Sequence, residues 1–338
     1  MLISIVIPTL NEESRIERAL KSIREQTINQ DEIEILIIDG GSKDRTREIA
    51  ENYGAKILEN PKVVPEEAKK LGLLSSVGKY IVFFDSDEEF TDKDQLKKRI
   101  RLFQDNLDVK AVLVNCLNTP KGYPNLTRYT NSFGDPFSYF VYRFDSENFI
   151  HSIDKRKYTC KKTENGGRIY YLKKDDIAPI GDGGTAMLDF EYLKANFNEE
   201  INNHDFVATK FDDVIYKTGC FGIIENDTIN HYSSACMKTY LKKLKFRVIT
   251  NLNPKDNISG YTARARTNKK LNNRKYLYLL YCLLPPVVLV DSAAISIRKK
   301  DFVFMLHFVF VYYVLFQIIY YSFKKLIGKK SENKNYGK

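Results

Sequence analysis

Two carboxylates at the end of a short apolar run are the residues best suited to chemistry in this sequence. Tyr80 to Phe84 is apolar, β-branched and aromatic, which predicts a buried strand, and Asp85 and Asp87 follow it. At strand spacing, two residues apart, both carboxylates would point to the same side. They would repel each other unless a cation lay between them, and a hard divalent cation with phosphate oxygens is the usual solution. The same residue types also favour turns and helix N-caps, so a polar turn remains an alternative.

The elements that would position these acids alternate between strands and helices. Apolar runs predict strands at 2–7, 33–38, 56–58 and 80–85, and helical spacing predicts helices at 16–26, 44–53 and 66–76. We expect Pro8 to end the first strand and Gly78 to stop the last of these helices. This alternation indicates an α/β fold with a parallel sheet, in which ligands bind beyond the carboxyl ends of the strands.

Three polar loops would meet at that edge, and together they resemble a known family. They are Ile7-Pro8-Thr9-Leu10-Asn11-Glu12-Glu13, Ile38-Asp39-Gly40-Gly41-Ser42-Lys43-Asp44-Arg45-Thr46 and Phe83-Phe84-Asp85-Ser86-Asp87. In this order they resemble glycosyltransferase family 2, closely over residues 1–90 and more loosely to about 235. The resemblance implies a GT-A fold, which is Rossmann-like, with a mostly parallel sheet and flanking helices.

The resemblance also implies roles for individual residues. Pro8, Thr9, Glu12 and Asp39 would bind the nucleoside of a nucleotide-diphosphate sugar, with UDP and GDP both open as the nucleotide. Asp85 would bind the ribose, and Asp87 together with Asp85 would hold Mg²⁺ or Mn²⁺ on the diphosphate. Turn chemistry remains an alternative for Pro8, and a cap on the following helix remains one for Asp39.

Further motifs of the family follow in the second part of the chain. Residues 181–186 resemble its glycine-rich segment before an acceptor-binding helix, which we expect at 188–197, so that Asp182 and Gly183 would lie on the acceptor side. His204-Asp205 matches a Glu-Asp pair whose Asp is the catalytic base, although His204 departs from that pattern. Asp182, Asp212 and Asp213 therefore remain substitutes for Asp205 as the base.

One histidine and two arginines complete the candidate site. The resemblance would place His231 near the diphosphate or the metal, and the alternative is a hydrogen-bonded histidine at a strand end. Residues 118–180, after a strand predicted at 109–116, are polar, aromatic and poorly periodic, and we expect them to be the acceptor side, partly loop. Arg128 and Arg143 could bind a phosphate of a lipid acceptor there, although solvated or structural roles are also open.

The charge of the chain is divided unevenly along its length. The 338 residues carry a net charge of +10, but residues 238–338 hold 21 Lys and Arg against 4 Asp and Glu, a net of +17. Residues 1–237 hold 32 against 39, a net of −7. The basic character belongs to the C-terminal part, which argues against a nucleic-acid-binding domain and for contact with anionic lipid.

Hydropathy in that C-terminal part predicts membrane association. Residues 238–248 have the pattern of an amphipathic helix at a membrane surface. Two apolar stretches at 276–297 and 302–323 are each long enough to cross a bilayer. Pro285-Pro286 and Asp291 interrupt the first, so a kinked or re-entrant helix is an alternative there. Two spans would return the basic end to the cytoplasm but would leave Arg298 to Lys300 outside, so the topology stays open.

These features define the predicted organisation. We expect a catalytic domain at 1–235, a basic juxtamembrane segment at 236–275, one or two transmembrane helices at 276–323 and a disordered tail at 324–338. The five cysteines show no metal or redox spacing and the first residues show no secretory signal, so we expect reduced thiols and a cytoplasmic catalytic domain on a membrane.

The predicted activity is an inverting, metal-dependent transfer of a sugar to a lipid-linked acceptor, either a polyprenyl or dolichyl phosphate or a lipid-linked glycan. A nucleotidyltransferase is an alternative, but its glycine-rich, basic N-terminal loop is missing between Ile7 and Asn11. A non-catalytic membrane scaffold is a second alternative, which the intact Asp-x-Asp disfavours. A processive polymerase is disfavoured because a chain without Trp has no Gln-x-x-Arg-Trp motif.

Overall fold

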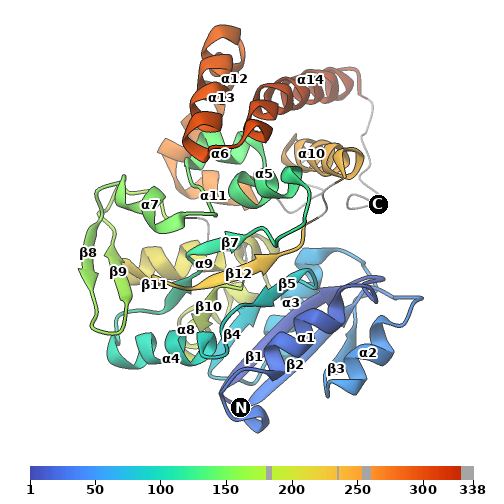
Figure 1. Ribbon diagram of the computed structural model, residues 1–338, viewed down its shortest axis with the longest axis vertical. Coiled ribbons are helices and arrows are strands. Elements are labelled where there is room, and N and C mark those ends of the chain that lie inside the picture. The colour runs from blue at the N-terminus through green and yellow to red at the C-terminus, as the bar shows by residue number, and fades with distance from the viewer. Residues whose placement is uncertain (180–184, 234–235, 253–259, 329–338) are drawn as a thin grey trace. The chain divides into compact units, whose positions relative to one another are not determined.

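The computed structural model describes residues 1–179, 185–233, 236–252 and 260–328, and these residues form two compact units. The first unit comprises Met1–Pro120 and Ser146–Tyr232, and the second comprises Lys121–Asp145 and Ser233–Lys338. Figure 1 shows the sheet of the first unit and the helices of the second.

The first unit contains the strands. They are β1 (Ile3–Thr9), β2 (Ile33–Asp39), β3 (Lys56–Glu59), β4 (Tyr80–Phe83), β5 (Glu88–Phe90), β6 (Ala111–Leu113), β7 (Cys116–Asn118), β8 (Thr159–Lys162), β9 (Gly167–Tyr171), β10 (Met187–Asp189), β11 (Cys220–Ile224) and β12 (Thr228–His231). Nine form one sheet in the order β3-β2-β1-β4-β10-β6-β11-β9-β8, and three form a second sheet in the order β5-β12-β7. β1 to β4 pair in parallel, as do β6 and β11, whereas β8, β9 and β10 join antiparallel.

Helices flank this sheet. They are α1 (Ile16–Arg24), α2 (Thr46–Asn52), α3 (Pro65–Ser75), α4 (Gln95–Asp105), α7 (Phe149–Asp154), α8 (Phe190–Phe197) and α9 (His204–Thr218), with short 3₁₀ turns η1 (Gln30–Glu32) and η2 (Glu200–Asn202). The predicted α/β fold and its parallel N-terminal half are therefore confirmed. The antiparallel strand β10, which separates β4 from β6, was not predicted.

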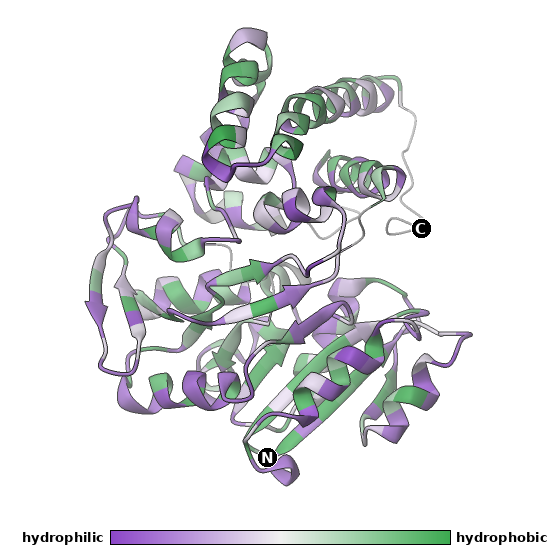
Figure 2. Ribbon diagram, in the orientation of Figure 1, coloured by the Kyte–Doolittle hydropathy of each residue, from purple (hydrophilic) through white to green (hydrophobic). Residues whose placement is uncertain are grey.

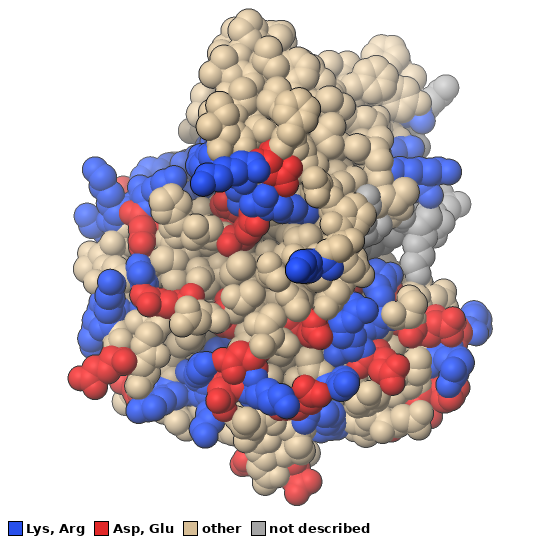
Figure 3. Space-filling model, viewed as in Figure 1, with Lys and Arg blue, Asp and Glu red and all other residues tan. Residues whose placement is uncertain are grey.

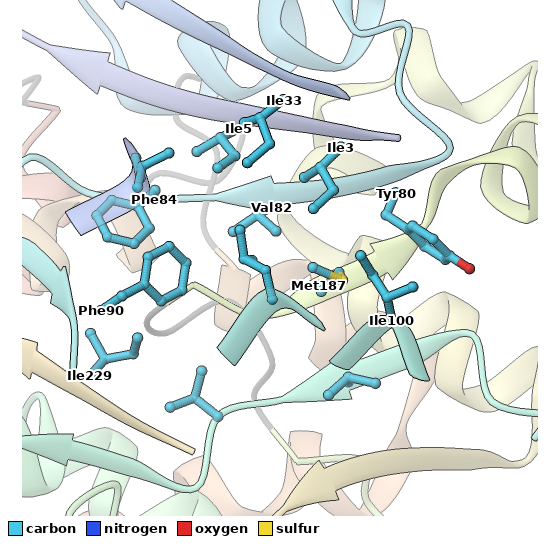
Figure 4. Close-up of a cluster of buried hydrophobic side chains, with 14 of the residues drawn as sticks. Ile3, Ile5, Ile33, Tyr80, Val82, Phe84, Phe90, Ile100, Met187 and Ile229 are labelled. Atoms are coloured by element: carbon cyan, nitrogen blue, oxygen red, sulfur yellow. The ribbon is translucent and has the colours of Figure 1, made fainter. Parts of the chain in front are cut away.

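The apolar strands form a core because both faces of the sheet are covered. Every residue of β4 is buried, and so are Ile3, Ile5 and Ile7 of β1. Figure 4 shows Ile3, Ile5, Tyr80 and Val82 of this core together with Met187 of β10 and Ile100 of α4. Runs that are apolar at every position are what a sheet covered on both faces requires.

Pro8 does not end the first strand, contrary to the prediction. β1 continues to Thr9, and Pro8 lies opposite Ile38 of β2. The pairing of β1 with β4 stops earlier, at Val6 and Phe83. At Pro8 the strand therefore has a neighbour on one side only, and a proline without an N–H is tolerated at such an edge.

Two glycines on α3 and just after it allow close packing against β1. A Cβ on Gly72 would lie 2.2 Å from Cγ1 of Val6, and one on Gly78 would lie 2.6 Å from the backbone nitrogen of Ser4. α3 ends at Ser75, before Gly78. Gly78 is thus required for the close approach of two backbones, and the prediction that it stops the helix is wrong.

Other predicted elements differ in detail from the structure. The second helix begins at Thr46 and not at Asp44 as predicted, and the side chain of Asp44 accepts a hydrogen bond from the backbone N–H of Thr46 at 3.0 Å just before it. The single strand predicted at 109–116 is two strands, β6 and β7, which belong to different sheets. The helix predicted at 188–197 begins at Phe190, because Leu188 pairs within the large sheet.

The second unit is helical. Its elements are α5 (Asn125–Phe133), α6 (Pro136–Tyr142), α10 (Met237–Leu252), α11 (Gly260–Thr267), α12 (Lys269–Cys282), α13 (Pro285–Lys299), η3 (Phe302–Met305) and α14 (Leu306–Leu326). Aromatic side chains of α5, including Tyr129 and Phe133, share one buried cluster with Tyr240 of α10 and Phe310 of α14. The stretch 121–145, which we expected to be partly loop, thus forms two helices that pack with the C-terminal ones.

The apolar C-terminal helices differ from two straight spans. Among the described residues, Phe302–Leu326 is the one helix long and apolar enough to cross a membrane. Lys270–Cys282 and Pro285–Lys299 pass the same test only as a pair, and they are bent by 103° at the break. The sequence alternative of a kinked or re-entrant first segment describes this geometry. Figure 2 shows the apolar character of these helices in green.

Candidate active site

The carboxyl ends of β1, β2 and β4 bring the three predicted loops to one edge of the sheet. Thr9 and Asp39 are direct neighbours across the parallel pair β1–β2, and β4 lies on the other side of β1. The parallel register places the residues after each strand at the same edge, where ligands bind in such sheets.

Asp39 is held firmly within its own loop. Its side chain is fully buried, and its Oδ2 accepts hydrogen bonds from the backbone N–H groups of Gly41 and Ser42 at 3.1 and 3.0 Å. Its Oδ1 accepts from the hydroxyls of Ser42 at 2.5 Å and Thr9 at 3.3 Å. The carboxylate thus shapes the 39–42 turn and does not cap the helix that follows, whose N-cap residue is Arg45.

The first and second loops are joined by hydrogen bonds. Asn11 exchanges two of them with the second loop, because its backbone N–H donates to Ser42 Oγ at 2.9 Å and its Oδ1 accepts from the backbone N–H of Lys43 at 2.8 Å. The backbone N–H of Glu12 donates to Thr46 Oγ1 at 2.7 Å. Two of the predicted nucleoside-binding loops therefore form one connected surface.

Asp85 and Asp87 lie in the turn between β4 and β5 and not in a strand. β4 ends at Phe83, and the backbone N–H of Glu88 donates to the carbonyl of Asp85 at 3.1 Å, which closes the turn. The expectation that strand alternation aligns the two carboxylates is therefore wrong. Asp85 is exposed, and the side chain of Asp87 is 16% exposed.

Strand pairing in the small sheet brings His231 to this turn. β12 runs antiparallel to β5, and His231 lies opposite Glu88. Nε2 of His231 lies 3.6 Å from Oδ1 of Asp87, and the backbone N–H of Tyr232 donates to the carbonyl of Asp87 at 2.8 Å. The structure therefore brings together Asp87 and His231, two residues that are far apart in the sequence.

Two further charged residues belong to this cluster. Arg15 bridges two predicted site residues, because its Nε lies 2.9 Å from Glu12 Oε2 and its Nη1 lies 3.7 Å from Asp87 Oδ2. Glu88 is buried, and its Oε2 accepts a hydrogen bond from the backbone N–H of Asp85 at 2.9 Å. Sequence reasoning missed both, although Glu88 directly follows the Asp-x-Asp and Arg15 lies three residues after Glu12.

Three acidic residues, Asp85, Asp87 and Glu88, lie close together in this turn and shift the pKa values around it. Burial, with Asp85 adding to it, raises the pKa of Glu88 to about 8. Burial alone would lower the pKa of His231, but Asp87, Glu88 and Asp85 outweigh it and raise the pKa to about 9. A divalent cation would also relieve the repulsion between the carboxylates, and carboxylate oxygens are the ligands that hard metal ions prefer.

The three predicted metal ligands, Asp85, Asp87 and His231, do not form a complete metal site. Within the described residues, no group of three or more His, Cys, Asp or Glu side chains has an arrangement that could hold a metal ion. The Asp87–His231 pair is the part of the predicted set for which the structure gives a short distance. Exposed Asp85, two residues away, is the remaining predicted ligand.

The predicted base and its substitutes lie in different surroundings. Asp205 lies in the first turn of α9, but its side chain, like all of Asp182 and Gly183, lies outside the residues that the structure describes. Asp212 is 4% exposed, and Asp213 accepts a hydrogen bond from Thr209 Oγ1 at 2.6 Å. Asp205 therefore stays a prediction.

The two predicted acceptor arginines belong to the second unit and form ion pairs there. Nη1 of Arg128 lies 3.1 Å from Asp301 Oδ2, and Nη1 of Arg143 lies 3.3 Å from Asp291 Oδ2. These pairs fix helix ends and turns within that unit. Their role toward an acceptor stays a prediction.

Comparison with known proteins identifies similar sequences. A family described as "Glycosyl transferase family 2" matches residues 4–197. The poly(ribitol-phosphate) beta-N-acetylglucosaminyltransferase TarS of Staphylococcus aureus (strain Mu50) is 31% identical over 250 residues, which cover 64% of this chain and 43% of TarS. The 4,4'-diaponeurosporenoate glycosyltransferase of Staphylococcus haemolyticus is 32% identical over 108 residues, 30% of this chain and 28% of that protein. The chain thus spans less than half the length of either relative.

Among solved structures, the mannosyltransferase PcManGT from Pyrobaculum calidifontis, in complex with GDP-Man and Mn²⁺, is similar with a TM-score of 0.49. The match is 15% identical and covers 94% of this chain and 87% of that one.

Proposed function

The chain belongs to glycosyl transferase family 2, and on that basis we propose that it transfers a sugar from a nucleotide-diphosphate sugar to a lipid-linked acceptor at a membrane. The observation that carries the proposal is the meeting of Thr9, Asp39 and the 85–88 turn at one edge of the parallel sheet, with His231 beside Asp87. This edge offers a hydrogen-bonded polar loop around buried Asp39, which suits a nucleoside, next to an acidic turn, which suits a cation.

We assign the donor to the two joined loops and the acidic turn. The loops at Pro8–Glu12 and Asp39–Ser42 bind the nucleoside, which can be that of UDP or GDP. Asp87, Asp85 and His231 would hold Mg²⁺ or Mn²⁺, and the ion would supply Lewis-acid stabilisation of the diphosphate leaving group. Arg15, 3.7 Å from Asp87, would help to orient that carboxylate.

The reaction is a single displacement with inversion. The acceptor oxygen forms a bond to the anomeric carbon, and the bond from that carbon to the diphosphate oxygen breaks, so that the nucleoside diphosphate leaves. When the acceptor is a hydroxyl, Asp205 takes its proton. When the acceptor is an ionised lipid phosphate, no proton needs to be removed.

The proposed acceptor depends on the C-terminal part of the chain. The names of the two relatives give different acceptors, poly(ribitol-phosphate) and 4,4'-diaponeurosporenoate, so they support no single choice. The apolar helices and the net charge of +17 over 238–338 support a membrane location, with the catalytic residues on the cytoplasmic side. A lipid-linked acceptor follows, because it would be confined to that surface.

The test is donor turnover by the purified full chain in detergent with Mn²⁺ and a membrane lipid extract. We expect one of a panel of UDP- and GDP-sugars to release its nucleoside diphosphate and to label a lipid. Asp87→Ala should lose this activity, and Asp108→Asn, an exposed acid far along the sheet, should keep it. Equal turnover by Asp87→Ala would contradict the assignment, and no turnover of any donor by the wild type would favour a non-catalytic scaffold.

A further inference from the structure

One apolar face of the second unit is uncovered. On α14, Val309, Phe316, Ile319 and Phe323 are between 53% and 63% exposed, and they recur at helical spacing along one stripe. At the corner between α12 and α13, Leu283 and Leu284 are 69% and 53% exposed. Figure 3 shows the area over α12, α13 and α14 as almost unbroken tan, with Lys and Arg grouped at its border over α6 and the foot of α13. An apolar area this large marks an interaction surface.

The opposite face of α14 is attached to α10 along the whole length of both helices. Near the start, the rings of Phe310 and Tyr240 lie 4.9 Å apart, and the hydroxyl of Tyr313 donates to the carbonyl of Leu241 at 3.2 Å. Near the end, Nζ of Lys325 donates to the carbonyl of Leu252 at 2.7 Å. The two helices therefore run side by side and in the same direction.

α10 cannot accompany α14 across a bilayer. Its first three turns carry five cationic residues, which are Lys238, Lys242, Lys243, Lys245 and Arg247. Lys242 and Lys245 are exposed. Cations at the centre of a bilayer are strongly disfavoured, whereas a basic helix at the headgroup level is stabilised by anionic lipid. Because α14 is bound to α10 from end to end, crossing would require α14 to break these contacts.

The start of α14 is attached to α5 as well. Asp301, which caps η3 through the backbone N–H of Val303 at 3.0 Å, pairs with Arg128 of α5. At the second residue of α14, Nδ1 of buried His307 is hydrogen-bonded to the hydroxyl of Tyr129 at 2.7 Å. An ion pair and a buried hydrogen bond thus hold the helix to α5 at the end where a span would have to leave the water.

The bent pair α12–α13 does not provide a span either. The two helices have 14 and 15 residues, about 21 and 22 Å at about 1.5 Å per residue, against a hydrocarbon core of about 30 Å. Asp291, near the middle of α13, accepts a hydrogen bond from Tyr281 at 2.9 Å and pairs with Arg143, the residue after α6. Each half is too short, and the acidic residue that would sit in the lipid is held against α6.

We propose that the second unit is a monotopic membrane-binding platform, which enters one leaflet of an anionic bilayer and does not cross it. The stripe on α14 and the α12–α13 corner contact the acyl chains, and the exposed Lys238, Lys242 and Lys245 of α10 contact the lipid headgroups. The partner is a lipid surface rather than a protein, because the same unit combines the apolar face with the basic excess of the chain. This departs from the one or two transmembrane helices that hydropathy predicts.

The inference rests on the membrane location in the proposed function but not on the donor chemistry. It is tested first by sidedness in sealed vesicles that carry the full chain. We would introduce Lys300→Cys, between α13 and α14, and Gly328→Cys, just after α14 and beyond the apolar stripe, in separate variants; both positions are exposed. The vesicles are treated with a membrane-impermeant thiol reagent, and peptide mass spectrometry measures the extent of labelling at each engineered cysteine. Native Cys160, which is exposed in β8 of the first unit, is the reference.

Both engineered cysteines should be labelled in intact vesicles to the same extent as Cys160. Protection of either engineered site that disappears only when detergent opens the vesicles would mean that a segment crosses, and would overturn the inference. Thermal stabilisation by nucleoside diphosphates, measured on the same preparations, reports the donor site independently. Failure of the membrane inference, seen in the labelling, is therefore distinguishable from failure of the proposed donor site, seen in the thermal stabilisation.

A second experiment tests the surface itself by flotation with preformed vesicles of phosphatidylcholine with and without phosphatidylglycerol. Phe316→Asp/Ile319→Asp should reduce flotation on the anionic vesicles about tenfold. The matched control is Val77→Asp/Leu107→Asp, which alters two exposed apolar residues of the first unit and should float like the wild type. Unchanged flotation of the stripe variant would contradict the proposal. A second outcome would also contradict it: the wild type, free of detergent, is a dimer that does not float, and the stripe variant is a monomer. A second copy of the chain would then cover the stripe.

Discussion

At the scale of single residues, Asp87 and His231 act as one unit if both hold the same cation. We expect Asp87→Asn and His231→Gln each to lower kcat/KM about 100-fold or more. The kcat/KM of the double variant should be close to that of the less active single variant. Once one substitution has removed the ion, the second has no further effect on it. Steady-state kinetics of the four proteins form the double-mutant cycle.

Fully additive losses would mean that the two residues act independently, and would argue against a shared ion. Asp108→Asn serves as the control for charge removal at an exposed site.

A buried ion pair between α4 and the residue before β12 gives a stability prediction. Arg99 is fully buried, and its Nε and Nη2 each donate to a carboxylate oxygen of Asp227 at 2.8 Å. Asp227 also accepts from Gln95 Nε2 at 2.7 Å. Asp227→Ala leaves the guanidinium uncompensated and should cost about 3–5 kcal/mol of unfolding free energy, measured with urea.

The control lies on the same helix. Arg101 and Asp105 form an exposed pair at 3.4 Å, and Asp105→Ala should change the free energy of unfolding by less than about 0.5 kcal/mol. Equal effects of the two alanine variants would contradict the importance of burial.

Sequence reasoning found the site residues that lie within single loops, the family resemblance added His231, and both missed Glu88 and Arg15. Pro8 to Glu12, Asp39 and the Asp-x-Asp were visible because each follows an apolar run. Glu88 and Arg15 were not, because their roles depend on the meeting of distant segments. The hydrogen bond from Tyr232 to Glu89, which helps to join β12 to β5, links residues 143 positions apart.

At the scale of elements, the contact of α3 with β1 depends on the absence of a side chain at Gly72. Alanine normally favours a helix over glycine by about 1 kcal/mol. Here its Cβ would lie 2.2 Å from a methyl group of buried Val6, so Gly72→Ala should be destabilising by about 1–3 kcal/mol instead. Thermal or urea unfolding measures the difference.

Ser75→Ala on the same helix is the matched control and should be neutral or slightly stabilising. Val6→Ala should reduce the cost of Gly72→Ala when the two are combined. A stabilised Gly72→Ala protein would show that the helix lies farther from β1 than the structure has it.

Elements with a clear period could be predicted, and short or interrupted ones could not. β1, β2, α1 and α3 have strong apolar patterns and were predicted within a few residues. β10 has only three residues and is followed directly by the apolar residues of α8, so its sequence could not be told apart from the start of that helix. Its antiparallel position between β4 and β6 could therefore not be predicted. The break in the apolar stretch 276–297 was foreshadowed by Pro285-Pro286, but its angle was not.

At the scale of the whole molecule, the chain does not divide at one point. Lys121–Asp145 packs with the C-terminal helices, although it is surrounded in sequence by the sheet-forming unit. Hydropathy placed a single boundary near residue 235. It left residues 121–145 in the first domain, because their composition does not show that they pack with the C-terminal helices.

A truncation tests this organisation. A protein ending at residue 235 would expose Tyr129 and Phe133, which are at most 5% exposed in the full chain. It should therefore aggregate rather than yield a soluble catalytic domain. A protein ending at Gly328 keeps the aromatic cluster and should behave as the full chain does in detergent. A monodisperse, nucleotide-binding 1–235 protein would contradict the packing of α5 and α6 described above.

The most direct test of the central claim is thermal stabilisation of the detergent-solubilised chain by UDP, GDP, CMP and dTDP, each with Mn²⁺ and with EDTA. A ligand at 100 times its Kd adds about 2.7 kcal/mol to the unfolding free energy, so binding raises Tm measurably. We predict that one nucleoside diphosphate raises Tm with Mn²⁺, and that EDTA or Asp87→Asn removes the increase. A Tm that no nucleotide changes, or an increase that is equal in EDTA and in Asp87→Asn, would contradict a metal-dependent nucleotide-sugar site at this turn.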